Sequence, residues 1–363
     1  MERYSQTSIA IVFIAWIIAV LCNAAQFKDR CKPNSGFNYS QFFVVFLLFS
    51  IFDFAGGDWI NYYKLYLHQI IFRDEGHFEE IYTWFAYNSF SNFFVWRLYV
   101  WGIACLFLTL TIHRLKINPG FFSLLLLIIY FQFFVGGRQS LAFALLYYGL
   151  SFIIAPNGKS KLTCFILFGI FATLSFYCHR SAIIYIAVAI ISIILKLNKK
   201  TILLSIIAFP ILYGSLLLII NNFLDYGLIG ESESAHGEGY LNSEDYGEIN
   251  NNGLIRRIID WTPIILLFVF TIFKLARNRE WKRADILYFK QAYILFYISW
   301  LFRGQLVSKF LAPRFMDACL FPLTLFSAVY LIDKRNNRYV RFAFIMFILS
   351  DLYRWLYGIY KAA

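Results

Sequence analysis

The sequence predicts an all-α, polytopic integral membrane protein of about twelve transmembrane helices, some of them short or broken. Of its 363 residues, 60% are hydrophobic and only 15% are charged, and the mean hydropathy is +0.62. Soluble globular domains are far less apolar than this. The apolar residues also gather in runs of about 20, which is the length that a helix needs to cross a bilayer.

The predicted spans are apolar runs separated by short polar or glycine-containing joints, and we assign all of residues 1–363 to one transmembrane domain. Residues 9–25 are longer than the apolar core of a signal peptide, so we interpret this run as a retained first span. The spans are 7–25, 38–54, 94–112, 119–135, 139–155, 162–178, 181–196, 201–221, 260–275, 285–302, 310–331 and 341–358.

The distribution of lysine and arginine predicts the orientation. Six short loops carry 19 of the 33 basic residues and alternate with basic-poor loops, so they belong on the cytoplasmic side. These loops are 26–37, 113–118, 156–161, 196–200, 274–284 and 332–341. The two long loops, 55–93 and 222–259, are net acidic and are then outward loops. The net charge of +12 follows from this cytoplasmic bias, which argues against a nucleic-acid partner.

Five arginines do not follow the cytoplasmic bias, because each falls at the predicted outer end of a span. An arginine at mid-bilayer depth costs roughly 2.5–3.5 kcal/mol, so it indicates a partner or a function. The guanidinium group binds phosphate and carboxylate oxygens in a bidentate manner, which suits an anionic ligand. The five are Arg97, Arg138, Arg180, Arg303 and Arg314.

Two polar joints contain the most informative of these arginines. In the stretch 135–142, Gly136 and Gly137 precede Arg138 and permit a tight turn or a close approach to a ligand. In the stretch 176–181, His179 precedes Arg180, and histidine has a pKa suited to proton transfer near neutral pH. We interpret both joints as parts of one anion-binding site at the outer membrane face.

Three short motifs resemble the EpsG-like branch of bacterial Wzy-type polymerases. They are Asp58-x-x-x-Tyr62-Tyr63-x-x-Tyr66, Arg138-Gln139-x-x-Ala142 and His179-Arg180-Ser181-Ala182, which occur in this order on one predicted face. Members of that branch polymerise O-antigen or exopolysaccharide repeat units at the outer face of the bacterial inner membrane. The resemblance covers most of the chain in span number and loop order.

The resemblance implies a glycosyltransferase that moves glycan from an undecaprenyl-diphosphate donor to the non-reducing end of a lipid-linked acceptor, without cofactor or metal. The diphosphate-binding residues would be Arg138, Arg180, Arg303 and Arg314. The catalytic base would be His179 or Asp58. The glycan-binding residues would be Tyr62, Tyr63, Tyr66, Gln139 and Arg97. The six cysteines are scattered without metal-type spacing.

Each of these residues also has a purely structural interpretation. Arginines at helix ends reach towards lipid phosphates, and Arg97 lies among interfacial aromatic residues. His179 would then cap a helix, Asp58 would belong to a turn, and the tyrosines would form an aromatic belt. We expect Pro313 to break its helix and expose backbone donors beside Arg314, although Asp317 lies one turn away as an ion-pair partner.

Two other functions share the same ligand. An O-antigen ligase uses the same donor but transfers the glycan to lipid A core. A flippase or other transporter of lipid-linked oligosaccharide would need charge through the depth of both leaflets, whereas these arginines lie at one. The predicted partners are the undecaprenyl-diphosphate-linked oligosaccharide and membrane lipid, and a chain-length regulator protein is a further candidate.

Overall fold

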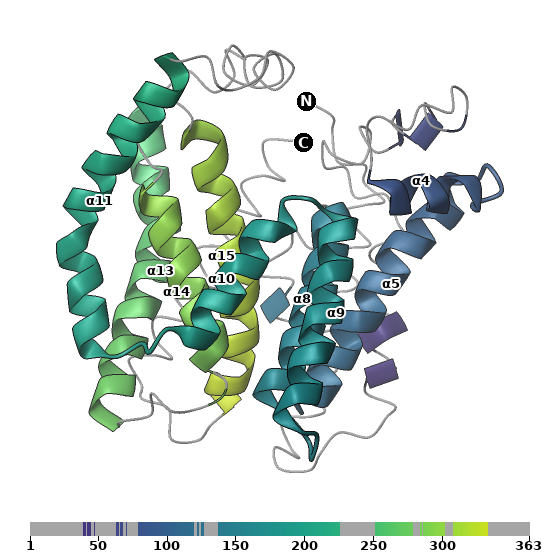
Figure 1. Ribbon diagram of the computed structural model, residues 1–363, viewed down its shortest axis with the longest axis horizontal. Coiled ribbons are helices and arrows are strands. Elements are labelled where there is room, and N and C mark those ends of the chain that lie inside the picture. The colour runs from purple at the N-terminus through teal and green to yellow at the C-terminus, as the bar shows by residue number, and fades with distance from the viewer. Residues whose placement is uncertain are drawn as a thin grey trace. The chain divides into compact units, whose positions relative to one another are not determined.

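Figure 1 shows the computed structural model of the chain, which consists of helices and connecting turns, with no strand in the residues that it describes. Those residues are 79–119, 137–225, 251–278, 284, 286–301 and 308–332, together with scattered positions between 39 and 70 and between 122 and 126. For some helical residues, Arg314 among them, only the backbone is described.

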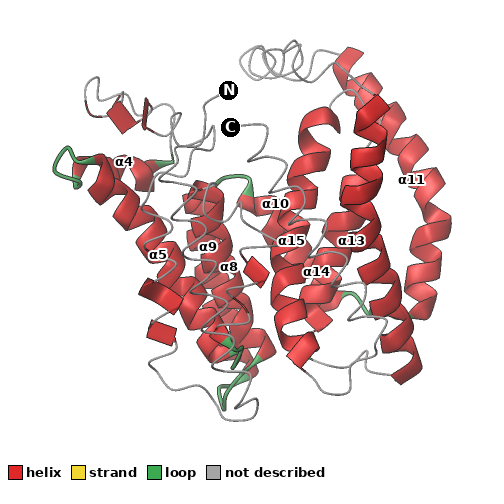
Figure 2. Cartoon of the chain, turned by 180° about the vertical axis from the view of Figure 1, so that it is seen from behind, coloured by secondary structure: helices red, strands yellow, loops and turns green. Residues whose placement is uncertain are grey.

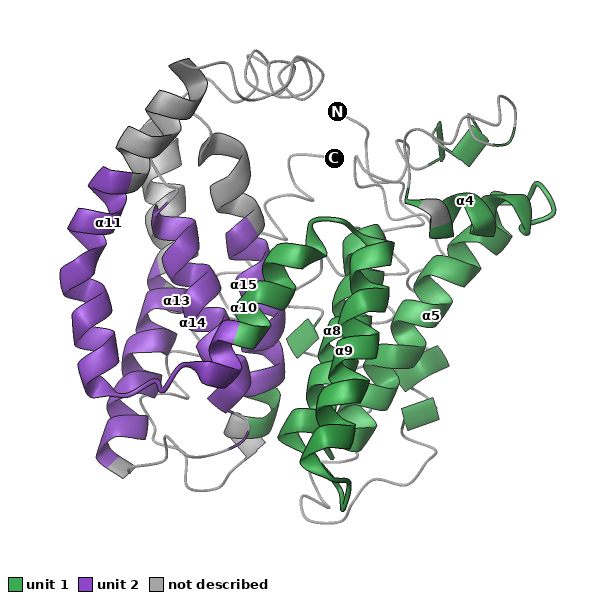
Figure 3. Cartoon of the chain, in the orientation of Figure 1, with its two compact units in different colours: residues 1–190, 327–332, 352–363 green, residues 191–326, 333–351 purple. Residues whose placement is uncertain are grey.

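The chain divides into two compact units (Figure 3). Unit 1 comprises residues 1–190, 327–332 and 352–363, and unit 2 comprises residues 191–326 and 333–351. The residues that the sequence singles out most strongly, around positions 138 and 180, both fall in unit 1.

Unit 1 is built around α8, which packs against both α5 and α9. Helix α4 lies across the end at which α5 begins, and this arrangement is visible from both sides (Figures 1 and 2). The helices are α4 (Glu80–Tyr87), α5 (Phe93–Arg114), α8 (Gly137–Ile154), α9 (Lys161–Cys178) and the first turns of α10 (Ala182–Ile194).

A glycine permits the close packing of α8 on α9. A Cβ atom added at Gly149 would lie 2.8 Å from the Cβ of Phe171, so a larger residue would force the helices apart. The Ser175 hydroxyl on α9 donates to the Ala142 carbonyl on α8 over 2.7 Å, which fixes the register of the pair. Helix α9 begins at an ordinary N-cap, where Ser160 accepts a hydrogen bond from the Thr163 amide.

Helix α4 is held in place by hydrogen bonds to its neighbours. The Trp96 indole on α5 donates to the Tyr82 carbonyl over 3.2 Å, and the Tyr82 hydroxyl donates to the Arg138 carbonyl on α8 over 3.4 Å. Tyr82 and Trp96 are both fully buried. These contacts place the N-terminal end of α4 beside the N-terminal end of α8.

Unit 2 contains α11 (Lys199–Asp225), α13 (Asn251–Asn278), α14 (Ile286–Leu301) and most of α15 (Ser308–Ile332). Tyr297 on α14 donates to the Ser205 carbonyl of α11 over 2.7 Å, and Tyr293 shares a hydrogen bond of the same length with the Ser205 hydroxyl. Lys290 donates to the Leu195 carbonyl over 2.7 Å, which satisfies an acceptor at the C-terminal end of α10.

Most predicted spans with described counterparts match a helix to within two residues at each end. Two predictions differ from the structure. Helix α11 ends at Asp225 and α13 begins at Asn251, so both helices extend into the predicted outward loop 222–259. The predicted break at Pro313 is wrong, because α15 continues through it from Ser308. Pro313 is the sixth residue of that helix, in its second turn, so it removes one intrahelical hydrogen bond near the helix start without ending the helix.

Two helices in the described part of the chain, α5 and α9, are long and apolar enough to span a membrane by length and composition. Three shorter apolar helices occur as well. The total of about twelve spans, and the single transmembrane domain, remain predictions.

Candidate active site

The Glu79 carboxylate joins the two polar joints that the sequence singles out. One oxygen, Oε2, accepts a hydrogen bond from Nη1 of Arg138 over 3.0 Å. The other, Oε1, lies 3.2 Å from Nδ1 of His179 and accepts from the Arg180 amide over 3.3 Å. Arg138, His179 and Arg180 therefore meet around one acidic side chain, at the end of unit 1 where α4, α8 and α10 begin and α9 ends.

The backbone of each joint explains how these groups are presented. His179 ends α9 with an extended backbone, and its carbonyl accepts a hydrogen bond from Ala182 over 2.7 Å as α10 starts. On α8, a Cβ atom added at Gly137 would lie 2.7 Å from the Trp101 ring. The glycine predicted to allow a close approach does so, but towards the packed ring of Trp101 rather than a ligand. This packing fixes the start of α8, and with it Arg138.

The carboxylate of Glu79 is largely buried, with 10% of its side chain exposed. Burial by itself raises its pKa, but the hydrogen bond with His179 and the positive charge of Arg138 together outweigh that effect and lower the pKa from 4.5 to about 2. Glu79 is therefore ionised at physiological pH and can only accept hydrogen bonds. Nδ1 of His179 must then donate the proton of the shared hydrogen bond, so Nε2 is the ring nitrogen that can exchange a proton with a ligand.

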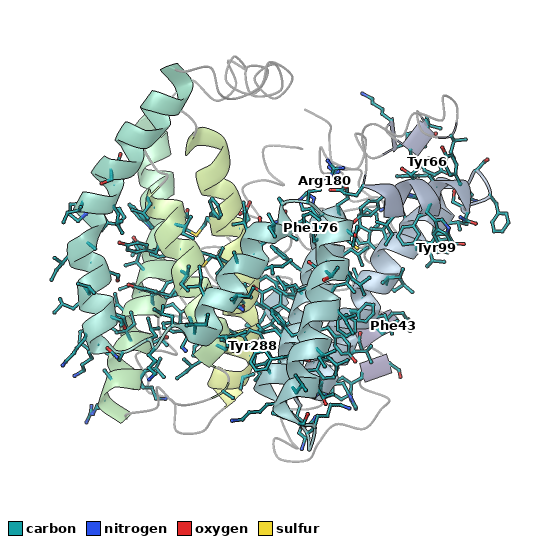
Figure 4. The ribbon with its side chains drawn as sticks, in the orientation of Figure 1. Phe43, Tyr66, Tyr99, Phe176, Arg180 and Tyr288 are labelled. Atoms are coloured by element: carbon teal, nitrogen blue, oxygen red, sulfur yellow. The ribbon has the colours of Figure 1, made fainter. Side chains whose placement is uncertain are left out.

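The two joint arginines differ in exposure. The Arg138 side chain is 26% exposed and engaged by Glu79, whereas Arg180 is exposed and projects from the joint between α9 and α10 (Figure 4). Gln139 turns towards α10, where its amide lies 3.5 Å from the Tyr185 hydroxyl. The Arg138 guanidinium is thus held by the same carboxylate as the His179 imidazole. The Arg180 side chain is exposed instead.

Other residues predicted for the site lie elsewhere in unit 1. Arg97 is buried, with its guanidinium 5.5 Å from the centre of the Trp101 ring and 5.9 Å from that of Phe93. This is the environment of a packed cation, not of a glycan-binding residue open to solvent. Tyr66 is also buried and its hydroxyl bonds to Ser89 over 2.7 Å, so its ring has no face available for a sugar.

Tyr63 is 39% exposed and touches Phe93 edge to face, which leaves part of its ring accessible. Asp58, Tyr62 and Arg303 lie outside the described residues. Arg314 lies in α15, in unit 2, and its side chain is not described. Among the residues that the structure describes, no group of three or more His, Cys, Asp or Glu side chains is arranged to hold a metal ion.

The sequence interpretation missed Glu79, which it counted only as one acid of the outward loop 55–93. The available signal was indirect. Arg138 and Arg180 both lie at helix N-termini, where the helix dipole disfavours a positive charge, so a nearby carboxylate was to be expected. Nothing in the sequence distinguishes Glu79 from the adjacent Glu80 or from the other acids of that loop.

The apolar helices α5 and α9 favour a membrane-associated helical protein. The chain belongs to the EpsG family, whose family model matches residues 37–363. This confirms the resemblance seen in the sequence and implies a polysaccharide polymerase activity of the glycosyltransferase type. No curated protein and no solved structure matches the chain.

Proposed function

We propose that the protein polymerises lipid-linked oligosaccharide repeat units at the periplasmic face of the bacterial inner membrane. The donor is a glycan on undecaprenyl diphosphate, and the acceptor is the non-reducing end of a second lipid-linked unit. The observation that carries the proposal is the convergence of Arg138, His179 and Arg180 on Glu79 at one end of unit 1. It combines a proton acceptor and cationic groups in one site, and the reaction needs both.

The proposed chemistry follows from the positions of these groups. The acceptor hydroxyl attacks the anomeric carbon of the donor sugar, and its proton passes to Nε2 of His179. The bond between the anomeric carbon and the diphosphate oxygen breaks, and the leaving group takes the bonding electrons. Arg180, which is exposed, and Arg138 stabilise the negative charge that develops on the diphosphate. Asp58 remains the alternative base from the sequence.

A membrane position is supported by the outer surface of α9. The helix exposes large apolar side chains along one stripe, namely Leu162, Phe165, Ile166, Ile170 and Leu174. An aqueous solvent would disfavour an exposed apolar stripe of this length, whereas lipid tails would accommodate it. Since the Arg138 and His179 joints lie at the ends of α8 and α9 opposite the predicted cytoplasmic loop 156–161, the site is expected at the outer leaflet.

Elongation by purified protein tests the reaction. Given only a lipid-linked repeat unit, the wild-type protein should form longer lipid-linked products without nucleotide, ion gradient or added metal, because the diphosphate bond already activates the donor sugar. His179→Gln should reduce the rate by about two orders of magnitude or more, the typical contribution of a general base. If instead the protein moves the carrier between leaflets of liposomes and forms no longer product, it is a flippase. If product appears only when lipid A core is supplied, it is a ligase.

Cysteine labelling tests the orientation. Ser91, in the exposed turn between α4 and α5, and Asn157, in the exposed turn between α8 and α9, mark opposite ends of unit 1. In a background without the native cysteines, Ser91→Cys should react with a membrane-impermeant thiol reagent added to cells with a permeabilised outer membrane. Asn157→Cys should react only after lysis. Labelling of Asn157→Cys in cells with an intact inner membrane would reverse the proposed orientation.

A further inference from the structure

Glu79 occupies the N-cap position of α4 but does not cap the helix. The short polar side chains that ordinarily occupy this position, such as Asp or Ser, accept a hydrogen bond from an amide in the first helical turn, which contributes about 1 kcal/mol. The Glu79 backbone has the extended conformation of an N-cap residue, yet its side chain makes no such bond. Both of its oxygens instead reach groups 59 to 101 residues away along the chain. The local stabilisation is absent, and a long-range arrangement replaces it.

The two carboxylate oxygens have different partners. Oε2 is held by the Arg138 guanidinium, while Oε1 meets Nδ1 of His179 and the amide of Arg180. Three groups from two separate joints thus restrain one carboxylate, and the carboxylate restrains the imidazole. A carboxylate on one imidazole nitrogen fixes the tautomer and the orientation of the ring, so that the other nitrogen is presented as a base.

We propose that Glu79 is a positioning residue that holds the His179 imidazole as a proton acceptor with Nε2 available, while Arg138 keeps the carboxylate in place. This inference rests on the proposed function, in which His179 takes the proton of the acceptor hydroxyl. The ionised state of Glu79, which follows from its lowered pKa, supports the role because it fixes which nitrogen of the imidazole carries the hydrogen.

The surrounding structure supplies the rigidity that a positioning residue needs. Helix α4 is tied to α5 through the hydrogen bond from Trp96 to the Tyr82 carbonyl, and to α8 through the hydrogen bond from Tyr82 to the Arg138 carbonyl. The start of α8 is fixed by the close packing of Gly137 on Trp101. Glu79, one residue before α4, is therefore anchored relative to Arg138 by contacts that do not involve its own side chain. A matched control is Tyr87→Phe at the other end of α4, because Tyr87 is 48% exposed and this change leaves Glu79 and the anchoring contacts of Tyr82 intact.

A double-mutant cycle distinguishes positioning from a purely structural ion pair. Glu79→Gln keeps the shape of the side chain and removes its charge, so we expect kcat to fall about tenfold or more, with KM changed less than about threefold. In a His179→Gln background, measured in single turnovers, the same Glu79→Gln change should alter the rate less than about twofold. The control Tyr87→Phe should retain at least about half of the wild-type kcat. Equal losses from Glu79→Gln in both backgrounds would overturn the proposal.

A spectroscopic measurement keeps the test decisive where the His179→Gln background is too slow to measure. The ¹⁵N resonances of His179, assigned by their loss in His179→Gln, should show a protonated Nδ1 in the wild-type protein in lipid bilayers. They should shift in Glu79→Gln and stay unchanged in the control Tyr87→Phe. Identical His179 resonances in wild type and Glu79→Gln would contradict the proposal.

The proposed function and the role of Glu79 can be refuted separately. If the wild-type protein forms no longer product from a lipid-linked repeat unit, the proposed function fails. If the wild-type protein elongates the unit and Glu79→Gln retains its kcat and its His179 resonances, the proposed function stands and the role of Glu79 is refuted.

Discussion

The two ends of α8 each meet an arginine, and the arginines are held in opposite ways. At the C-terminal end, Nη2 of Arg114 donates to the Ala155 carbonyl over 2.5 Å and to the Pro156 carbonyl over 3.4 Å, and its guanidinium lies 3.9 Å from the centre of the Phe152 ring. At the N-terminal end, Arg138 pairs with the Glu79 carboxylate. One arginine satisfies backbone carbonyls, whereas the other requires an acid.

The helix dipole explains the difference. A positive charge at a helix C-terminus is favourable, and Arg114 also supplies donors to carbonyls that lack an intrahelical partner. A positive charge at a helix N-terminus is unfavourable by roughly 0.3–1 kcal/mol, so Arg138 sits where folding alone would not place it. We therefore interpret Arg114 as a structural residue and Arg138 as a functional one.

The exposed arginine of the site should be sensitive to the shape of its side chain. Arg180→Lys keeps the charge but loses the planar fork, so product formation should slow by about tenfold or more, since a charge-assisted hydrogen bond contributes roughly 1.5–3 kcal/mol. The variant should accumulate in the membrane as the wild type does. Glycan ladders of normal length and intensity from Arg180→Lys cells would show instead that this residue only anchors to lipid headgroups.

The middle of α8 should govern stability. Gly149→Ala would bring a Cβ atom to 2.8 Å from that of Phe171, and such overpacking typically costs about 1–3 kcal/mol. Gly169→Ala on α9 is the matched control, because a Cβ atom there meets nothing within 4 Å and alanine favours helix. Thermal unfolding in detergent should show a lower Tm for Gly149→Ala and an equal or higher Tm for Gly169→Ala. Equal losses in both would mean that helix packing at Gly149 is not the cause.

Acid should weaken the contact at the N-terminal end of α8 and leave the contact at its C-terminal end unchanged. The folded-state pKa of Glu79 is about 2, below its ordinary value of 4.5, so its ionised form stabilises the fold. This contribution is fully present above pH 4.5 and is lost as the pH falls towards 2. The stability difference between wild type and Glu79→Gln should therefore shrink across that window. The difference between wild type and Arg114→Met should not, because the carbonyls that Arg114 contacts do not titrate.

The sequence was informative where structure depends on local pattern. The predicted spans 94–112, 139–155 and 162–178 correspond closely to α5, α8 and α9, because long apolar runs end at polar joints. The joints around Arg138 and His179 were also identified, since a charge between two apolar runs is conspicuous.

What the sequence did not predict depends on long-range contacts. Glu79 is selected from several acids only by the way α4 docks on α5 and α8, through contacts such as that of Trp96 with Tyr82. In the same way, the burial of Arg97 and Tyr66 among aromatic rings follows from packing and not from local pattern. The course of α15 through Pro313 shows that a proline near a helix start need not end the helix.

A paired measurement on the two arginines of α8 tests the central claim most directly. The elongation rate per folded molecule and the Tm should be measured for Arg138→Lys and Arg114→Met in parallel. Arg138→Lys keeps the charge beside Glu79, so we expect a nearly unchanged Tm. The elongation rate should fall by about tenfold or more, because the lysine cannot form the bidentate contact. Arg114→Met should lower the Tm, because two carbonyls lose their donor, and leave the rate per folded molecule unchanged. A normal rate for Arg138→Lys together with a reduced rate for Arg114→Met would contradict the placement of the active site at the N-terminal end of α8.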